Sequence, residues 1–191
     1  MKEFLGLTAT VSVFVAYIPY VRDVLRGKTK PHVYSWFIWG LLSLLVAGLQ
    51  LQEGAGPGAY MTLAAGFVSF FIFFLGLRNG KKDITKTDTA VFILALFATG
   101  IWLLAEQPLT SMILLVGAGT LGSIPTFRKS WHKPHSETLF YWAISPFRHG
   151  LSMGAITSYN AVTLLNPLVW VVINSVMSVM LIFRRRSLAR K

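Results

Sequence analysis

The sequence predicts an all-α integral membrane protein with seven transmembrane helices, arranged as two parallel three-helix bundles joined by a linker helix. Its composition, the placement of its basic residues and one repeated stretch predict this class. Of the 191 residues, 54% are hydrophobic and only 13% are charged, whereas soluble domains carry about 25% charged residues. Several apolar runs reach roughly 17–22 residues, so each can cross a hydrocarbon core of about 30 Å.

Seven apolar runs are expected to span the bilayer. They cover about residues 4–21, 33–51, 58–77, 89–105, 109–127, 138–157 and 161–183. The N-terminal run has no convincing signal-peptide cleavage site, so we interpret it as a mature helix. The predicted organisation is a first three-helix repeat (1–80), a linker helix (81–107) and a second three-helix repeat with a basic tail (108–191).

Basic residues follow every second predicted span. They are Arg22, Arg26, Lys28 and Lys30; Arg78, Lys81, Lys82 and Lys86; Arg128, Lys129 and Lys133; and Arg184, Arg185, Arg186, Arg190 and Lys191. The alternate loops hold no lysine or arginine. Positive loops stay on the cytoplasmic side, which predicts an outside N-terminus, a cytoplasmic C-terminus and an odd number of spans. The protein is therefore expected in a cell membrane, the cytoplasmic membrane in a bacterium, and its net charge of +11 does not indicate a nucleic-acid partner.

One stretch, residues 17–39, has a degenerate copy at 123–142. Both contain a proline, an arginine three residues later, a Lys-Pro-His, and a tryptophan seven residues after the histidine. The recurrence indicates a duplicated three-span unit. Because the fourth span returns the chain across the membrane, both copies run parallel. Parallel-repeat transporters bind their substrates between the halves near the midplane.

The matched residues are candidate hinges and gates. Pro19 and Pro125 each lack an N–H and free a carbonyl one turn earlier, so they form either static kinks or a pair of hinges. Trp39 and Trp142 lie about two turns into the second and sixth spans. They are either part of an interfacial aromatic belt or a paired aromatic gate.

The sixth span carries an arginine near the bilayer centre. Arg148 lies eleven positions after Glu137, about 17 Å deep at 1.5 Å per residue, where insertion costs at least about 2.5 kcal/mol. Water, an anionic ligand, or backbone carbonyls, including one freed by Pro146, could compensate it. We count Pro146 among the hinge candidates. His149 is either a packing residue or a proton carrier, and it points about 100° away from Arg148.

Polar residues in other spans complete a candidate substrate site. Asn174 lies at a depth similar to that of Arg148, and Ser69 is the nearest polar counterpart in the third span. A buried asparagine either joins helices or binds ligand hydroxyls, and both interpretations stay open.

The sequence lacks the residues that several classes of chemistry need. The chain has no cysteine, and it shows no nucleotide-binding loop, no H-E-x-x-H and no Ser-His-Asp set. We therefore expect no enzyme, no cofactor and no metal site. No aspartate or glutamate lies inside a predicted span, and a buried carboxylate is the usual proton relay in coupled transporters. Facilitated diffusion is favoured for that reason.

The chain resembles the PQ-loop superfamily and, within it, the seven-helix SWEET-type sugar transporters. Pro125-Thr126-Phe127 is similar to the Pro-Thr-Phe that ends a SWEET first or fifth helix, and residues 133–138 resemble the basic, serine-rich start of the following helix. Pro19-Tyr20 stands where PQ-loop proteins carry Pro-Gln. The resemblance implies hinge roles for both prolines, alternating access by rocking of two bundles, and a pocket asparagine on the seventh helix, for which Asn174 is the candidate.

These observations predict a transporter that moves a small polar solute, either sugar-like or another molecule with hydroxyl or carboxylate groups. The alternative is a sorting or ligand receptor on the same seven-helix fold, which binds without transport. The expected partners are the solute and the lipid bilayer. A homo-oligomer is not required, because one chain holds both half-units.

Overall fold

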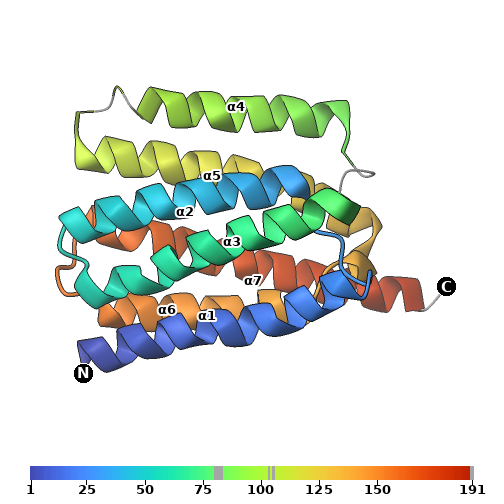
Figure 1. The fold of residues 1–191 in the computed structure, drawn as a ribbon, viewed down its shortest axis with the longest axis horizontal. Coiled ribbons are helices and arrows are strands. Elements are labelled where there is room, and N and C mark those ends of the chain that lie inside the picture. Colours follow the sequence, from blue (N-terminus) through green and yellow to red (C-terminus); the bar gives the residue numbers. More distant parts are fainter. Residues whose placement is uncertain (80–83, 103, 105, 190–191) are drawn as a thin grey trace.

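The computed structural model describes residues 1–79, 84–102, 104 and 106–189, and these form helices joined by short connections (Figure 1). The long helices are α1 (Lys2–Leu25), α2 (Val33–Gln52), α3 (Tyr60–Asn79), α4 (Lys86–Trp102), α5 (Pro108–His132), α6 (Leu139–Ala155) and α7 (Ala161–Ala189). Two short 3-10 helices, η1 (Gly56–Ala59) and η3 (Pro134–Ser136), precede α3 and α6. The described part of the chain contains no strand, which confirms the all-α class.

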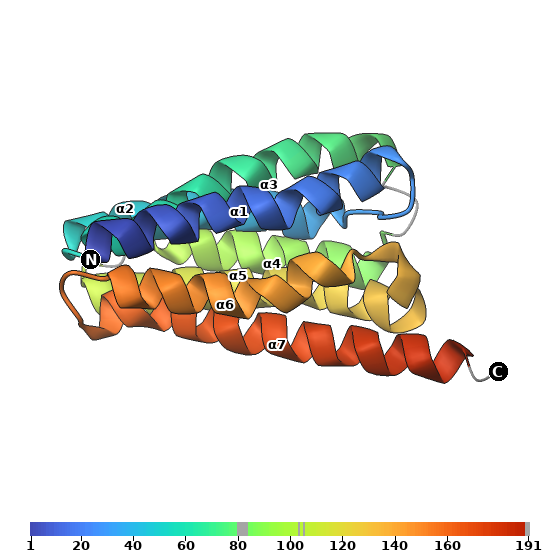
Figure 2. The ribbon, with the colours of Figure 1, turned by 90° about the horizontal axis from the view of Figure 1, so that it is seen from below.

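Five of these helices are long and apolar enough to cross a membrane by length and composition: α1, α2, Gly56–Leu77, α5 and Ala161–Leu188. The other two, α4 and α6, have 17 residues each, about 26 Å at 1.5 Å per residue. They lie alongside the longer helices in both views (Figures 1 and 2). Large apolar side chains cover the outer surface, including Phe14 and Ile18 on α1, Phe67 on α3, and Val172 and Val179 on α7. Such a surface suits lipid rather than water.

The helices pack as two similar groups. In the first, α1 and α2 both pack against α3, and in the second, α5 and α6 both pack against α7. The groups meet where α1 packs against α6 and where α2 packs against α5. Helix α4 packs outside them on α5 and α2.

The connections gather at two ends of the molecule. The chain between α1 and α2, the chain between α5 and α6, and the last turns of α7 lie at one end, which we call the basic end (Figure 1). The N-terminus, η1 and the chain between α6 and α7 lie at the other, which we call the opposite end.

Glycines let the backbone approach closely at the opposite end. A Cβ on Gly6 would meet Pro57 Cβ at 2.6 Å, and a Cβ on Gly58 would meet Ile156 Cγ1 at 2.6 Å. The chain also pairs there, because Thr157 N donates to Ala55 O (3.1 Å) and Ser158 N donates to Gly54 O (3.0 Å). The contact of Gly58 with Ile156 and the backbone pairing of residues 54–55 with 157–158 tie the first helical group to the second.

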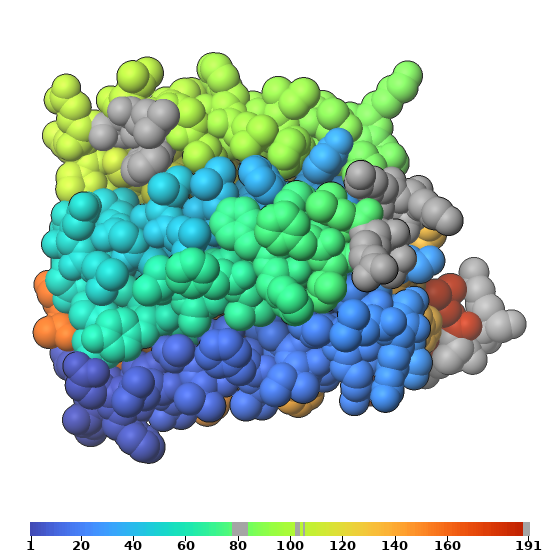
Figure 3. Space-filling view, viewed as in Figure 1, coloured from blue at the N-terminus to red at the C-terminus, as the bar shows by residue number. Residues whose placement is uncertain are grey.

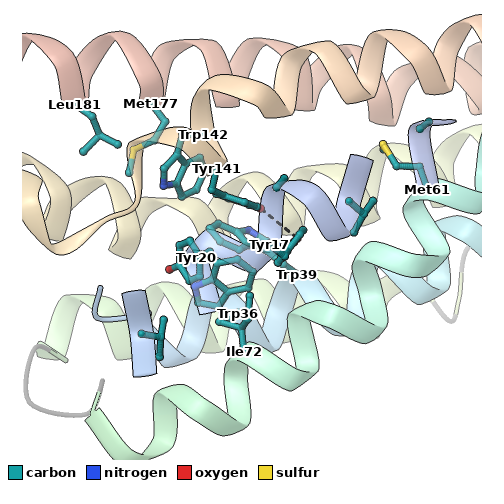
Figure 4. Packing of buried hydrophobic residues seen from close by; sticks show 14 residues of the cluster. Tyr17, Tyr20, Trp36, Trp39, Met61, Ile72, Tyr141, Trp142, Met177 and Leu181 are labelled. Atoms are coloured by element: carbon teal, nitrogen blue, oxygen red, sulfur yellow. Dashed lines mark hydrogen bonds between the residues drawn. The ribbon is translucent and has the colours of Figure 1, made fainter. Parts of the chain in front are cut away.

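An aromatic cluster fills the centre between the two groups. It consists of Tyr17, Tyr20, Trp36, Trp39, Tyr141 and Trp142, all buried, and their rings meet mostly edge to face (Figure 4). Side chains of α1, α2 and α3 close over the centre on the face drawn in Figure 3. The cluster borders the candidate site described next.

Candidate functional site

A cavity of about 40 Å³ lies between the two helical groups. That volume accommodates two or three water molecules. Its lining comes from α1, α2, α3, α6 and α7: Tyr17, Trp39, Ser43, Met61, Thr62, Ala65, Ser69, Tyr141, Trp142, Arg148, His149, Asn166, Trp170 and Asn174. The cavity is therefore aromatic and polar, although it lies deep among apolar helices.

The structure brings most of the predicted site residues together here. All four predicted binding residues, Arg148, Asn174, Ser69 and His149, line the cavity. Arg148 and His149 share it despite pointing about 100° apart along α6, because the cavity extends along more than one face of that helix. Their roles in binding stay predictions.

Arg148 is the central polar group. Its side chain is 3% exposed, and its Nη2 donates to Tyr141 Oη at 3.3 Å. The guanidinium carbon lies 5.1 Å from the Tyr17 ring centre and 5.3 Å from that of Tyr141, and the two tyrosine hydroxyls are 3.2 Å apart. Nε and Nη1 of Arg148 have no hydrogen-bond partner. One interpretation of the sequence was an arginine bonded to backbone carbonyls. The partners of Arg148 are instead tyrosine side chains.

Other polar atoms around the cavity are only partly satisfied. Asn174 Nδ2 donates to the carbonyl of Trp170 in its own helix at 2.6 Å. His149 Nδ1 and Thr62 Oγ1 are buried without a partner. Buried polar atoms are hydrogen-bonded in most native structures, so unpaired atoms around one cavity indicate a site for water or a ligand.

The two predicted gate tryptophans meet at the cavity wall. The ring centres of Trp39 and Trp142 are 5.9 Å apart at an interplanar angle of 75°. Trp39 Nε1 donates to Gly119 O on α5 at 3.2 Å, which fixes this ring across the boundary between the groups. The burial of both rings excludes a lipid-facing belt for them. Their action as a gate stays a prediction.

The three predicted hinge prolines lie outside the cavity lining. Pro19, Pro125 and Pro146 each lie inside α1, α5 or α6, and each helix continues through its proline. Their action as hinges stays a prediction.

Sequence reasoning did not select Tyr17 and Tyr141, which hold the guanidinium between them. The spacing of residues along α6 could have identified Tyr141. Tyr141, Ser145, Arg148 and Ser152 are spaced by four, three and four residues, so they lie on one face of α6. All four are buried, and this face packs toward the interior rather than toward lipid.

A buried carboxylate at the basic end was also missed. Glu137 lies just before α6, as its sequence position implied, but it is 2% exposed. One carboxylate oxygen accepts from Lys129 Nζ, and the other accepts from Tyr20 Oη (3.2 Å) and Trp142 Nε1 (3.1 Å). Lys129 also donates to Lys30 O. This network joins α1, α5 and the start of α6 next to the cavity.

A second ionic cluster attaches α4 at the basic end. Asp88 accepts two hydrogen bonds from Arg128, at 2.9 and 2.6 Å, and its Oδ2 lies 3.4 Å from His32 Nε2. Burial raises the pKa of Asp88, but hydrogen bonds from Arg128 and Thr85 outweigh it, so the pKa lies below its usual value. Burial lowers the pKa of His32 from 6.5 to about 4, although Asp88 opposes this. His32 is therefore neutral near pH 7.

No family model, curated protein or solved structure matches this chain. The cavity and the helices around it are therefore the features that indicate a function.

Proposed function

We propose that this chain is a seven-span membrane carrier that moves a small polar solute by alternating access. In this mechanism the binding cavity opens to one side of the membrane at a time. One observation carries the proposal. A cavity lined by polar and aromatic side chains, with buried and partly unpaired donors, lies where two similarly packed helical groups meet. A cavity placed in this way is accessible from either side through opposite rocking of the two groups.

The pairing of helices supports the duplicated arrangement. The contact of α1 with α6 and that of α2 with α5 are equivalent if the two groups repeat one unit. In this proposal α4 and α6 also span the bilayer, the basic end faces the cytoplasm and the chain has the PQ-loop, SWEET-type architecture. The basic end holds the basic connections and the last turn of α7, as the distribution of charge requires.

The contacts at both ends support a carrier rather than an open channel. At the basic end, Tyr20 donates to Glu137 and Lys129 donates to Lys30 O, and both hydrogen bonds join the first helical group to the second. At the opposite end, the backbone of residues 54–55 pairs with that of 157–158. The contacts at each end join one helical group to the other. The cavity can therefore open at an end only when the contacts at that end separate.

Solute flux into liposomes tests the proposal. Purified protein is reconstituted, and uptake of labelled sugars, polyols, hydroxy acids and amino acids is measured against protein-free liposomes. We expect saturable uptake of at least one solute, and its loss in Trp39→Arg, which places a bulky charge at the cavity wall. Phe67→Ala, a change on the outer face of α3, is the control. If none of these solute classes crosses faster than in protein-free liposomes, the carrier proposal is wrong.

A receptor on the same fold is the second candidate. Arg186 at the end of α7 favours it, because its exposed side chain gives the basic end a charge for an acidic partner. A receptor would bind a solute in the cavity without accelerating its flux, so the same preparation separates the two functions.

A further inference from the structure

The charge around the cavity is unbalanced. Among the residues that line it, Arg148 carries the only permanent charge, and no aspartate or glutamate is among them. The two carboxylates that are buried elsewhere in the described part of the chain, Glu137 and Asp88, are already engaged with Lys129 and Arg128. Arg148 is thus a buried cation without a counter-ion.

The tyrosine rings compensate this charge only in part. A cation over an aromatic face is stabilised by roughly 0.5–2 kcal/mol, and Arg148 has two such faces, Tyr17 and Tyr141. The penalty for burying an ion is several kcal/mol. An anion against the guanidinium would remove this deficit, whereas a neutral ligand would not.

The free hydrogen-bond donors indicate the same chemistry. A guanidinium has five N–H donors. Nε carries one and Nη1 carries two, and neither nitrogen has a partner. A carboxylate offers acceptors only, matches the planar fork of arginine and forms short charge-assisted hydrogen bonds.

We infer that the cavity binds a small monocarboxylate, such as a short hydroxy acid, with its carboxylate on Arg148. This inference deepens the proposed function and rests on it for the transport step. One cation balances one anionic charge, so a dicarboxylate would leave a second charge buried without a partner. The cavity of about 40 Å³ admits only a small molecule, and one of the size of lactate requires the two helical groups to move slightly apart, as the proposed rocking does. Asn166, Asn174 and Thr62, which also line it, supply hydrogen-bonding groups for a hydroxyl.

Binding can be followed by intrinsic fluorescence, because Trp39, Trp142 and Trp170 line the cavity. Detergent-purified protein is titrated with lactate, succinate, glycerol and chloride. We expect saturable lactate binding, with succinate and glycerol each at least tenfold weaker. In Arg148→Gln, lactate binding should weaken by roughly 10- to 150-fold, the range for a hydrogen bond to a charged group. Arg22→Gln, an exposed arginine outside the cavity, should bind as the unaltered protein does. Equal affinities for glycerol and lactate, or for Arg148→Gln and the unaltered protein, would overturn the inference, and so would tighter binding of chloride than of lactate.

A stability measurement separates a ligand-binding arginine from a structural one. Replacing a buried charge with an apolar residue of similar volume is often neutral or stabilising. Arg148→Met should therefore unfold at the same or a higher temperature than the unaltered protein without ligand, and lactate should no longer raise that temperature. A marked fall in Tm for ligand-free Arg148→Met would show that the arginine is structural and would contradict the inference.

Flux in liposomes distinguishes failure of this inference from failure of the carrier proposal. Lactate uptake that is lost in Arg148→Gln supports both. Lactate binding without uptake supports the site and refutes transport. Uptake of a neutral solute that persists in Arg148→Gln, without lactate binding, refutes the anion site and leaves the carrier intact.

Discussion

Replacing Glu137 with glutamine tests the network at the basic end. The side chain is buried, and it accepts hydrogen bonds from Lys129, Tyr20 and Trp142. Glutamine keeps nearly the same volume but has no charge, and it provides one acceptor oxygen where the carboxylate provides two. Lys129, which is 3% exposed, would lose its counter-ion.

The expected loss follows from these contacts. Breaking a buried ion pair by removing one partner costs about 3–5 kcal/mol. For a chain of this length, that corresponds to a fall in Tm on the order of 10 °C. Glu106→Gln, which changes an exposed carboxylate, should alter the free energy of unfolding by less than about 0.5 kcal/mol.

A double-mutant cycle supplies the assay. Unfolding of the unaltered protein, Glu137→Gln, Lys129→Met and the double variant is followed in detergent by circular dichroism. The double variant should be more stable than the sum of the single losses predicts, by roughly 2 kcal/mol, because it leaves no unpaired charge. Additive losses, or a loss below about 1 kcal/mol in Glu137→Gln, would refute the reasoning.

Three further predictions concern other parts of the molecule. Lowering the pH from 7 to 5 should reduce the free energy of unfolding by about 2 kcal/mol more in the unaltered protein than in His32→Gln. The histidine of the unfolded chain binds a proton below about pH 6.5, whereas His32 in the folded protein does so only near pH 4. Protonation between these two pH values therefore favours the unfolded chain. The folded protein has its full stability above pH 6.5 and loses this contribution as the pH falls toward 4. Equal pH profiles from thermal unfolding would contradict the prediction. Gly58→Ala should lower Tm, because its Cβ would meet the Ile156 Cα at 2.9 Å and overpacking costs about 1–3 kcal/mol. Gly48→Ala, with nothing within 4 Å of its Cβ, should not lower it. Because the chain has no cysteine, single-cysteine variants report orientation: an impermeant maleimide applied to intact cells should label Ser158→Cys and not Lys28→Cys, and the reverse would invert the predicted topology.

The helices could be predicted because their signal is local. Long apolar runs interrupted by charged or glycine-containing connections set their number and approximate limits, and the described residues form seven long helices in the order that these runs indicate. The repeat at Pro19 and Pro125 predicts which segments are equivalent, and that equivalence stays a prediction.

Predictability was lower where residues distant in sequence meet. Arg148 could be predicted because it is a charge in an apolar run. Its neighbours Tyr17 and Tyr141 were not predicted. Tyr17 lies 131 positions away along the chain, and an aromatic residue in a membrane helix has many ordinary roles. Glu137 was placed correctly at a helix start, but sequence position alone does not show whether such a residue faces water or an interior lysine. That depends on how α1, α5 and α6 converge.

Helix α7 extends well beyond what a bilayer requires. Its 29 residues reach about 43 Å, against a hydrocarbon core of about 30 Å, and the surplus projects past the other helices toward the C-terminus (Figure 1). Arg185 in this extension donates to the backbone carbonyls of Pro134 and Glu137. Its neighbours Arg184 and Arg186 would lie at the depth of lipid phosphates in the proposed orientation. In that orientation one helical segment would contact both the membrane surface and the connection that holds Glu137, so the lipid headgroup composition of the host membrane would influence how firmly the basic end is held.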